Sequence, residues 1–253
     1  MTRPRFAIYA LPGAGPADGA GAALCQRAEQ WLGRSAAGQP LMQGVPAGWT
    51  RAELDAITAS ARRYGFHATL KAPFRLTEGR TPAELYAALA GFAASHVGAL
   101  VPRLSLSCLS GFYALVPGAE AAGLHALADE VVTEFDAFRA PATEAEIARR
   151  RPELLTPRQR ELLKAWGYPY VLDEFFFHLT LTDRIPRGRR STVERTLRSW
   201  FAAWLGVTVP VNALALFTEA APGAPFVLHA VYPLQPVPSS RRADALAESE
   251  GTR

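Results

Sequence analysis

The chain has 253 residues, of which 49% are hydrophobic and 20% charged, a composition typical of a globular protein with one domain or two lobes around a shared core. No uninterrupted apolar run approaches the roughly 20 residues that a membrane-spanning helix needs. The net charge of +4 favours anionic partners only weakly.

The N-terminal segment predicts a first strand over residues 5–11. A signal peptide is the alternative, because Arg3 and Arg5 precede an apolar patch, but Pro12 and Gly13 cut that patch short. The chain has two cysteines, Cys25 and Cys108, and neither has a partner at metal-ligand spacing. We expect both to be reduced thiols rather than a disulfide. Together these features predict a cytoplasmic protein.

Capping boxes of the form S/T-x-x-E/Q predict where several helices begin. The pattern occurs five times, at Thr50–Glu53, Thr81–Glu84, Thr143–Glu146, Thr156–Gln159 and Ser191–Glu194. The helices expected after these boxes cover 51–63, 82–97, 144–150, 157–166 and 192–205. Apolar spacing alone predicts two more helices, over 21–33 and 120–136.

Strands are predicted between these helices from short apolar runs and turn residues. The expected strands cover 5–11, 65–71, 103–116, 171–182, 208–218 and 225–234. Gly111 marks a hairpin turn within the third of them, and Ala221-Pro222-Gly223-Ala224 joins the last two. The polar segment 239–253 lacks a core-facing side and is predicted to be disordered.

The order strand, helix, proline, hairpin occurs twice, which indicates an internal duplication. His67 lies in the first such strand and His178 in the second, and a capping box follows each histidine after a similar interval. We therefore predict an α+β, bilobal, pseudo-twofold fold with two antiparallel sheets flanked by helices around a central cleft. The expected parts are a single domain over 1–238, lobe 1 over about 12–118, lobe 2 over about 167–218 with exchanged terminal strands, and a helical insertion over 139–166.

The two motif strands each carry the pattern His-x-Thr-Leu inside an apolar run. Alternate residues of a strand share a face. The polar residues expected on the front faces are His67, Thr69 and Lys71 in the first copy and His178, Thr180, Thr182 and Arg184 in the second. A lone motif of this kind is usually structural, whereas two copies in matching contexts favour a functional pair.

Two such faces around one cleft suit an anion held between imidazoles. One neutral histidine can accept a proton from a nucleophile and the other, protonated, can donate one to a leaving oxygen. Threonine hydroxyls and nearby cations can stabilise the negative transition state of phosphodiester cleavage. Metal ligation by His67 and His178 is the less favoured alternative, because no third ligand stands at a suitable spacing. We expect neither a metal nor a cofactor.

Other residues near the motifs are candidates for substrate binding. Arg63 and Tyr64 immediately precede the first motif strand, Tyr9 lies on the first strand, and Tyr168 lies near the second motif. The arginine runs at 62–63, 149–151 and 187–190 either track a nucleic-acid backbone or form solvated surface, and the second reading is favoured. The remaining histidines are predicted to be structural: His96, His125 and His229.

The stretches "RYGFHATLKAPF", "FRAP", "LTPRQRELLKAWGYPYV" and "FHLTLTDRI" resemble the 2H phosphoesterase superfamily, in the branch encoded with bacterial phosphonate-degradation genes. This resemblance covers about residues 3 to 235. It implies that His67, Thr69, His178 and Thr180 form the two catalytic pairs and that no metal is needed. It also implies a substrate, 5-phosphoribosyl 1,2-cyclic phosphate, with Lys71, Arg63 and Arg184 as ligands of its 5-phosphate.

Three functions remain open from the sequence. The first is a cyclic phosphodiesterase that hydrolyses a small sugar phosphate in phosphonate catabolism. The second is an RNA enzyme that opens 2′,3′-cyclic phosphates or joins ends, and the third is a non-catalytic module that binds an anion or RNA. The expected partner is a small anionic phosphate ester rather than RNA or a membrane. Neither the oligomeric state nor the division of acid and base roles between the histidines follows from the sequence.

Overall fold

Over residues 4–16 and 18–238, which the computed structural model describes, helices and strands follow one another in a mixed order. The α-helices are α1 (Gly19–Leu32), α2 (Arg51–Tyr64), α3 (Pro82–Ser95), α4 (Ala122–Glu134), α5 (Glu144–Ala148), α6 (Pro157–Trp166) and α7 (Arg190–Trp200). The strands are β1 (Arg5–Ala10), β2 (Ala68–Arg75), β3 (Ala99–Val101), β4 (Ser105–Leu109), β5 (Phe112–Val116), β6 (Leu179–Thr180), β7 (Val209–Val211), β8 (Ala213–Glu219) and β9 (Val227–Pro233). The segment predicted to be disordered, 239–253, lies outside the described residues.

Two antiparallel sheets exchange strands between the halves of the chain. The first sheet has the order β2-β1-β8-β9, so the strand after His67 joins, through β1, the hairpin from the end of the chain. The second has the order β4-β5-β6, so the strand after His178 joins the hairpin of the first half. A small pair, β3 with β7, connects corresponding segments of the two halves. The predicted α+β class, with antiparallel sheets flanked by helices, is confirmed.

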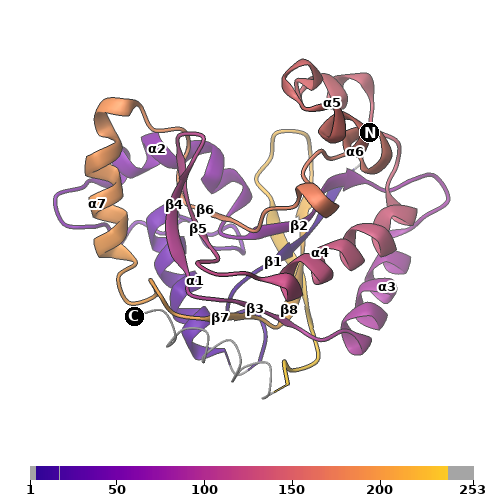
Figure 1. Cartoon of the computed structure of the whole chain (residues 1–253), viewed down its shortest axis with the longest axis horizontal. Coiled ribbons are helices and arrows are strands. Elements are labelled where there is room, and N and C mark those ends of the chain that lie inside the picture. Colours follow the sequence, from indigo (N-terminus) through magenta and orange to yellow (C-terminus); the bar gives the residue numbers. More distant parts are fainter. Residues whose placement is uncertain (1–3, 17, 239–253) are drawn as a thin grey trace.

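The helices divide between the two sheets. In Figure 1, α1, α2 and α7 lie on the left, α3 and α4 on the right, and α5 with α6 at the upper right. Hydrogen bonds fix this arrangement: the Trp31 indole of α1 donates to the Leu181 carbonyl beyond β6 at 2.7 Å, and the Trp200 indole of α7 donates to the Arg27 carbonyl of α1 at 3.1 Å. None of the described helices combines the length and the apolar composition needed to cross a bilayer.

Four of the five predicted capping boxes form. In each, a threonine hydroxyl accepts from the backbone N–H three residues on, and the acid or amide at that position accepts from the threonine N–H; they begin α2, α3, α5 and α6. The fifth prediction, Ser191–Glu194, is wrong. A short helical turn over Arg187–Arg189 leads directly into α7, so Ser191 already lies inside the helix. Glu194 instead pairs with Arg198 one turn further along.

The second motif strand is much shorter than predicted. Instead of a strand over 171–182, only Leu179–Thr180 pairs as β6, because a helical turn over Leu172–Glu174 precedes it and Leu172 has a φ of 52°. Beyond β6, the N–H groups of Leu181 and Thr182 both donate to the Tyr113 carbonyl, at 2.9 and 3.3 Å, which ends regular pairing. The first motif strand is also displaced, since β2 begins at Ala68, just after the histidine.

Candidate active site

A cavity of about 490 Å³ is lined by side chains of both motifs. His67 and Thr69 contribute from the first motif and Thr180 from the second. The aromatic side chains of the wall are Tyr9, Tyr64, Phe112 and Tyr168, and the charged ones are Arg5, Arg150, Asp183 and Arg184. Three arginines against one carboxylate make this cavity suitable for an anion.

His67 is positioned by the end of α2. Gly65 stops this helix at φ 79° and ψ −179°, a conformation that is essentially restricted to glycine. Its carbonyl then accepts a hydrogen bond from the His67 Nδ1, at 2.9 Å, which leaves Nε2 as the unprotonated nitrogen of the neutral ring. The Thr69 hydroxyl lies 3.3 Å from that Nε2. The Tyr9 ring stacks on the imidazole with 3.7 Å between centroids.

His178 repeats this local arrangement. Its Nδ1 donates to the carbonyl of Phe176, two residues earlier, at 2.8 Å, so Nε2 again becomes the free nitrogen. The ring lies 6.0 Å from the ring of Phe112, which lines the cavity, and Thr180 on the same strand lines the cavity directly. The two motifs therefore present imidazoles of the same tautomer from opposite sheets.

Both histidines are held neutral by their surroundings. Burial, with a smaller contribution from the charge of protonated His178, lowers the pKa of His67 to about 4 against the opposing hydrogen bond to Gly65. Burial likewise lowers the pKa of His178, against its hydrogen bond to Phe176. A bound anion would raise both pKa values again, because an opposite charge favours the protonated imidazole.

Lys71 does not share the face of His67 and Thr69, contrary to the predicted alternation. Thr69 of β2 pairs with Tyr9 of β1, but Lys71 pairs with Ile8. Between these two pairs β2 therefore advances by two residues while β1 advances by only one. This β-bulge turns Lys71 to the opposite face. On that face Lys71 is buried, with 3% of the residue exposed. Its ammonium group donates to the Val132 carbonyl at 3.0 Å and to the Asp136 carboxylate at 3.1 Å.

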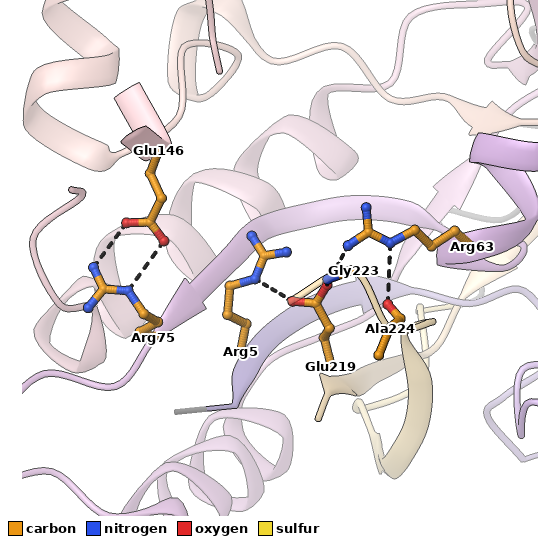
Figure 2. Close-up of polar contacts among 7 residues, drawn as sticks. All are labelled: Arg5, Arg63, Arg75, Glu146, Glu219, Gly223 and Ala224. Atoms are coloured by element: carbon orange, nitrogen blue, oxygen red, sulfur yellow. Dashed lines mark hydrogen bonds and ion pairs between the residues drawn. The ribbon is translucent and has the colours of Figure 1, made fainter. Parts of the chain in front are cut away.

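Arg63 also lies outside the histidine cavity. Its guanidinium group contacts the buried carboxylate of Glu219 and donates to the Ala224 carbonyl at 3.3 Å, as Figure 2 shows. It lines a second, adjoining cavity instead. The other predicted substrate-binding residues, Tyr9, Tyr64, Tyr168 and Arg184, all line the histidine cavity.

Three charged residues of the wall were not singled out from the sequence. Arg5 comes from β1, and Arg150 follows α5 in the predicted insertion, where it stands over the Tyr168 ring at 4.8 Å. Asp183 follows β6, and its carboxylate accepts from the N–H groups of Ser60 and Ala61 in α2 at 3.0 Å. Arg150 belongs to an arginine run that was read as solvated surface. Asp183 lies in the stretch "FHLTLTDRI" but was given no role, and Arg5 was noted only in the signal-peptide alternative.

The histidines predicted to be structural lie against aromatic rings away from this cavity. His96 stacks on Phe92, His125 meets the edge of Phe175, and His229 packs near Tyr86. Within residues 4–16 and 18–238, no three His, Cys, Asp or Glu side chains gather in a way that could hold a metal ion. Cys25 and Cys108 are free thiols.

Comparison with known proteins places the chain in a family. A family model described as "Protein of unknown function (DUF1045)" matches residues 69–227. Two curated relatives are both named ribose 1,5-bisphosphate phosphokinase PhnN. The protein from Janthinobacterium sp. (strain Marseille) is 40% identical over 80% of this chain and 46% of its own length, and that from Laribacter hongkongensis (strain HLHK9) is 35% identical over 88% and 50%. The chain thus spans about half the length of these relatives.

Two solved structures resemble the chain over most of its length. One, "Crystal structure of phosphoesterase", is 14% identical with a TM-score of 0.40, over 91% of this chain and 98% of its own. Another, "Crystal structure of E.coli LigT complexed with NADP+", is 14% identical with a TM-score of 0.40, over 93% and 99%. At this distance the function has to be inferred from the side chains of the cavity.

Proposed function

The chain belongs to the DUF1045 family, and we propose that it is a cyclic phosphodiesterase that uses His67 and His178 as proton-transfer groups. The observation that carries this proposal is the paired arrangement of the motifs. Each histidine is fixed through Nδ1 to the carbonyl two residues earlier, and side chains of both motifs reach one cavity. Two histidines that only fill space would not need matched tautomers. His67 lines the cavity directly, and His178 lies beside Phe112 in its wall.

In the proposed reaction, His67 is the general base and His178 the general acid. With a pKa of about 4, His67 is neutral near pH 7 and its Nε2 can take a proton from water. The water oxygen then bonds to phosphorus, the bond to the ester oxygen on the far side breaks, and Nε2 of protonated His178 gives its proton to that oxygen. The products are a phosphate monoester and a free hydroxyl group.

Neutral hydroxyls and cations in the wall account for charge stabilisation. Thr69 and Thr180 can donate to the non-bridging oxygens, and Arg5, Arg150 and Arg184 supply positive charge around them. The negative charge of the bound diester also raises the pKa of His178, so that binding prepares the acid. Side chains thus supply every proton transfer and the stabilisation of charge, and the proposed reaction needs no metal ion.

For the substrate, we propose a small sugar cyclic phosphate such as 5-phosphoribosyl 1,2-cyclic phosphate in phosphonate catabolism. The cavity volume of about 490 Å³ suits a single sugar ring with its phosphate groups. The curated relatives are named for a ribose bisphosphate, which supports a ribose phosphate in the same pathway, although this chain spans only half of each.

Phosphorus NMR tests this proposal directly. Protein treated with a chelator is offered 5-phosphoribosyl 1,2-cyclic phosphate and, separately, RNA that ends in a 2′,3′-cyclic phosphate. We expect the five-membered cyclic diester signal of the sugar to be replaced by a monoester signal, with little change in the RNA. Faster turnover of the RNA would favour the RNA enzyme instead. Binding without turnover of either substrate would indicate a non-catalytic module.

A further inference from the structure

A second cavity of about 250 Å³ adjoins the histidine cavity and is rich in arginine. We call it the arginine cleft; its arginines are Arg5, Arg63, Arg75, Arg139, Arg149 and Arg150. The two cavities share Arg5, Tyr64, Pro73 and Arg150 as wall residues. The two cavities therefore adjoin at these four residues.

Carboxylates hold several of these arginines in place without cancelling their charge. Glu146 accepts from Arg75 through two bonds of 3.2 and 2.9 Å, and Glu219, 1% exposed, bridges Arg5 and Arg63 (Figure 2). Arg139 pairs with Asp136 at 2.7 Å. Six arginines thus stand against three carboxylates, of which only Glu146 belongs to the described wall of the cleft. The cleft keeps a clear excess of positive charge.

Donors remain available where the two cavities meet. Arg5 uses its Nε on Glu219, and Figure 2 shows its two terminal nitrogens turned away from that carboxylate. Arg150 lies over the face of Tyr168, which leaves the edge of its guanidinium group free to donate. None of the ion pairs formed among the described residues includes Arg149 or Arg150. Fixed guanidinium groups with unused N–H donors suit a phosphate monoester.

We propose that the arginine cleft binds a second phosphate group of the same substrate, a monoester, while the diester lies between the histidines. This inference rests on the proposed function and deepens it: the substrate class is a small cyclic phosphodiester with an additional phosphate monoester on the same molecule. Arg5 and Arg150, which line both cavities, bridge the two phosphate groups. The volume of about 250 Å³ suits a single phosphate group of a compact molecule.

The test compares two substrates that differ only in the second phosphate: a ribose cyclic diester with a 5-phosphate, and the same diester with a free 5-hydroxyl. We expect the phosphorylated substrate to have a kcat/KM higher by about 10²-fold, as one or two charge-assisted hydrogen bonds allow. Arg149 lines the arginine cleft but not the histidine cavity, so Arg149→Gln should reduce this advantage by about tenfold and leave kcat/KM for the unphosphorylated substrate close to that of the wild type. Arg187→Gln, on an exposed arginine outside both cavities, is the matched control.

Equal kcat/KM for the two substrates in the wild-type protein, or equal losses on both in the variant, would overturn the second subsite and leave the phosphodiesterase proposal standing. Turnover of neither substrate would instead remove the phosphodiesterase proposal. In that case calorimetry that measures the binding of ribose 5-phosphate still tests whether the arginine cleft binds a phosphate monoester. Binding that weakens in Arg149→Gln but not in Arg187→Gln supports the arginine cleft, and binding unaffected by Arg149→Gln contradicts it.

Discussion

The ring of Tyr9 stacks on the imidazole of His67, with 3.7 Å between the centroids and 22° between the planes. Tyr9 is 1% exposed, so its ring shields one face of the imidazole from water. Because burial is the main cause of the low pKa of His67, this stack contributes to keeping the proposed base neutral. Strand β1 therefore tunes the proposed base as well as pairing with the strand that follows it.

The first prediction concerns this stack. Tyr9→Leu removes the aromatic cover, and we expect the pKa of His67 to rise from about 4 toward its ordinary value of 6.5. Tyr9→Phe keeps the ring and should leave the pKa unchanged. Proton NMR titration of the imidazole resonances measures both variants. An unchanged midpoint in Tyr9→Leu would show that the stack does not control the titration.

The second prediction is a pH dependence of stability. The folded-state pKa of His67, about 4, is below its unfolded value of 6.5, so the unfolded chain binds a proton more readily between these values. The stability linked to His67 is therefore complete above pH 6.5 and is lost as the pH falls toward 4, by about 3 kcal/mol at most. Urea unfolding at pH 7 and pH 4.5 should show a smaller loss for His67→Gln than for the wild type. Equal losses in the two proteins would refute the linkage.

The third prediction separates Lys71 from the cavity. Lys71→Met fills the same buried space but removes the donor to Val132, and Asp136 keeps its pair with Arg139. We expect a loss of about 1–3 kcal/mol of stability and a kcat/KM within about threefold of the wild type. Thr69→Val, on the cavity face, should do the reverse and lower kcat/KM by about 10–100-fold with little loss of stability. A large catalytic defect in Lys71→Met would contradict the observed bulge.

The fourth prediction concerns Asp183, which links the segment after β6 to α2. Asp183→Ala leaves the Ser60 and Ala61 N–H groups without their acceptor, and we expect a loss of about 1–3 kcal/mol in unfolding free energy. Because α2 leads into Gly65 and His67, kcat should fall as well. Asp173→Ala removes a solvent-exposed ion pair with Arg158 and should change the unfolding free energy much less than Asp183→Ala does. If Asp183→Ala and Asp173→Ala lowered the unfolding free energy equally, Asp183 would not be the link between the segment after β6 and α2.

Local sequence rules predicted most of the fold because they act within one or two turns. The threonine capping boxes placed the starts of α2, α3, α5 and α6, and Gly111 placed the hairpin of β4 and β5. The pairing of β2 with β1, and of β1 with β8, depends on contacts between segments that are distant in sequence. The internal repeat predicted that strands are exchanged between the halves, but it did not predict which strands pair.

The site was predicted where it follows the motifs and missed where it depends on register. Strict alternation placed Lys71 beside His67, but a single bulge against Ile8 and Tyr9 reverses that alternation, and no residue type in the strand marks it. Arg5 and Arg150 reach the cavity from β1 and from the end of α5, far from either motif in sequence. Tertiary packing alone brings them to the histidine cavity.

The central claim is that His67 and His178 act together on one phosphorus, and kinetics of three variants test it most directly. We expect His67→Gln and His178→Gln each to lower kcat on the cyclic diester by about 10²–10⁴-fold. Because both groups serve the same step, the kcat of the double variant should lie within about tenfold of the kcat of the less active single variant. Independent groups would instead give the product of the two losses. Wild-type turnover in either single variant would contradict the claim.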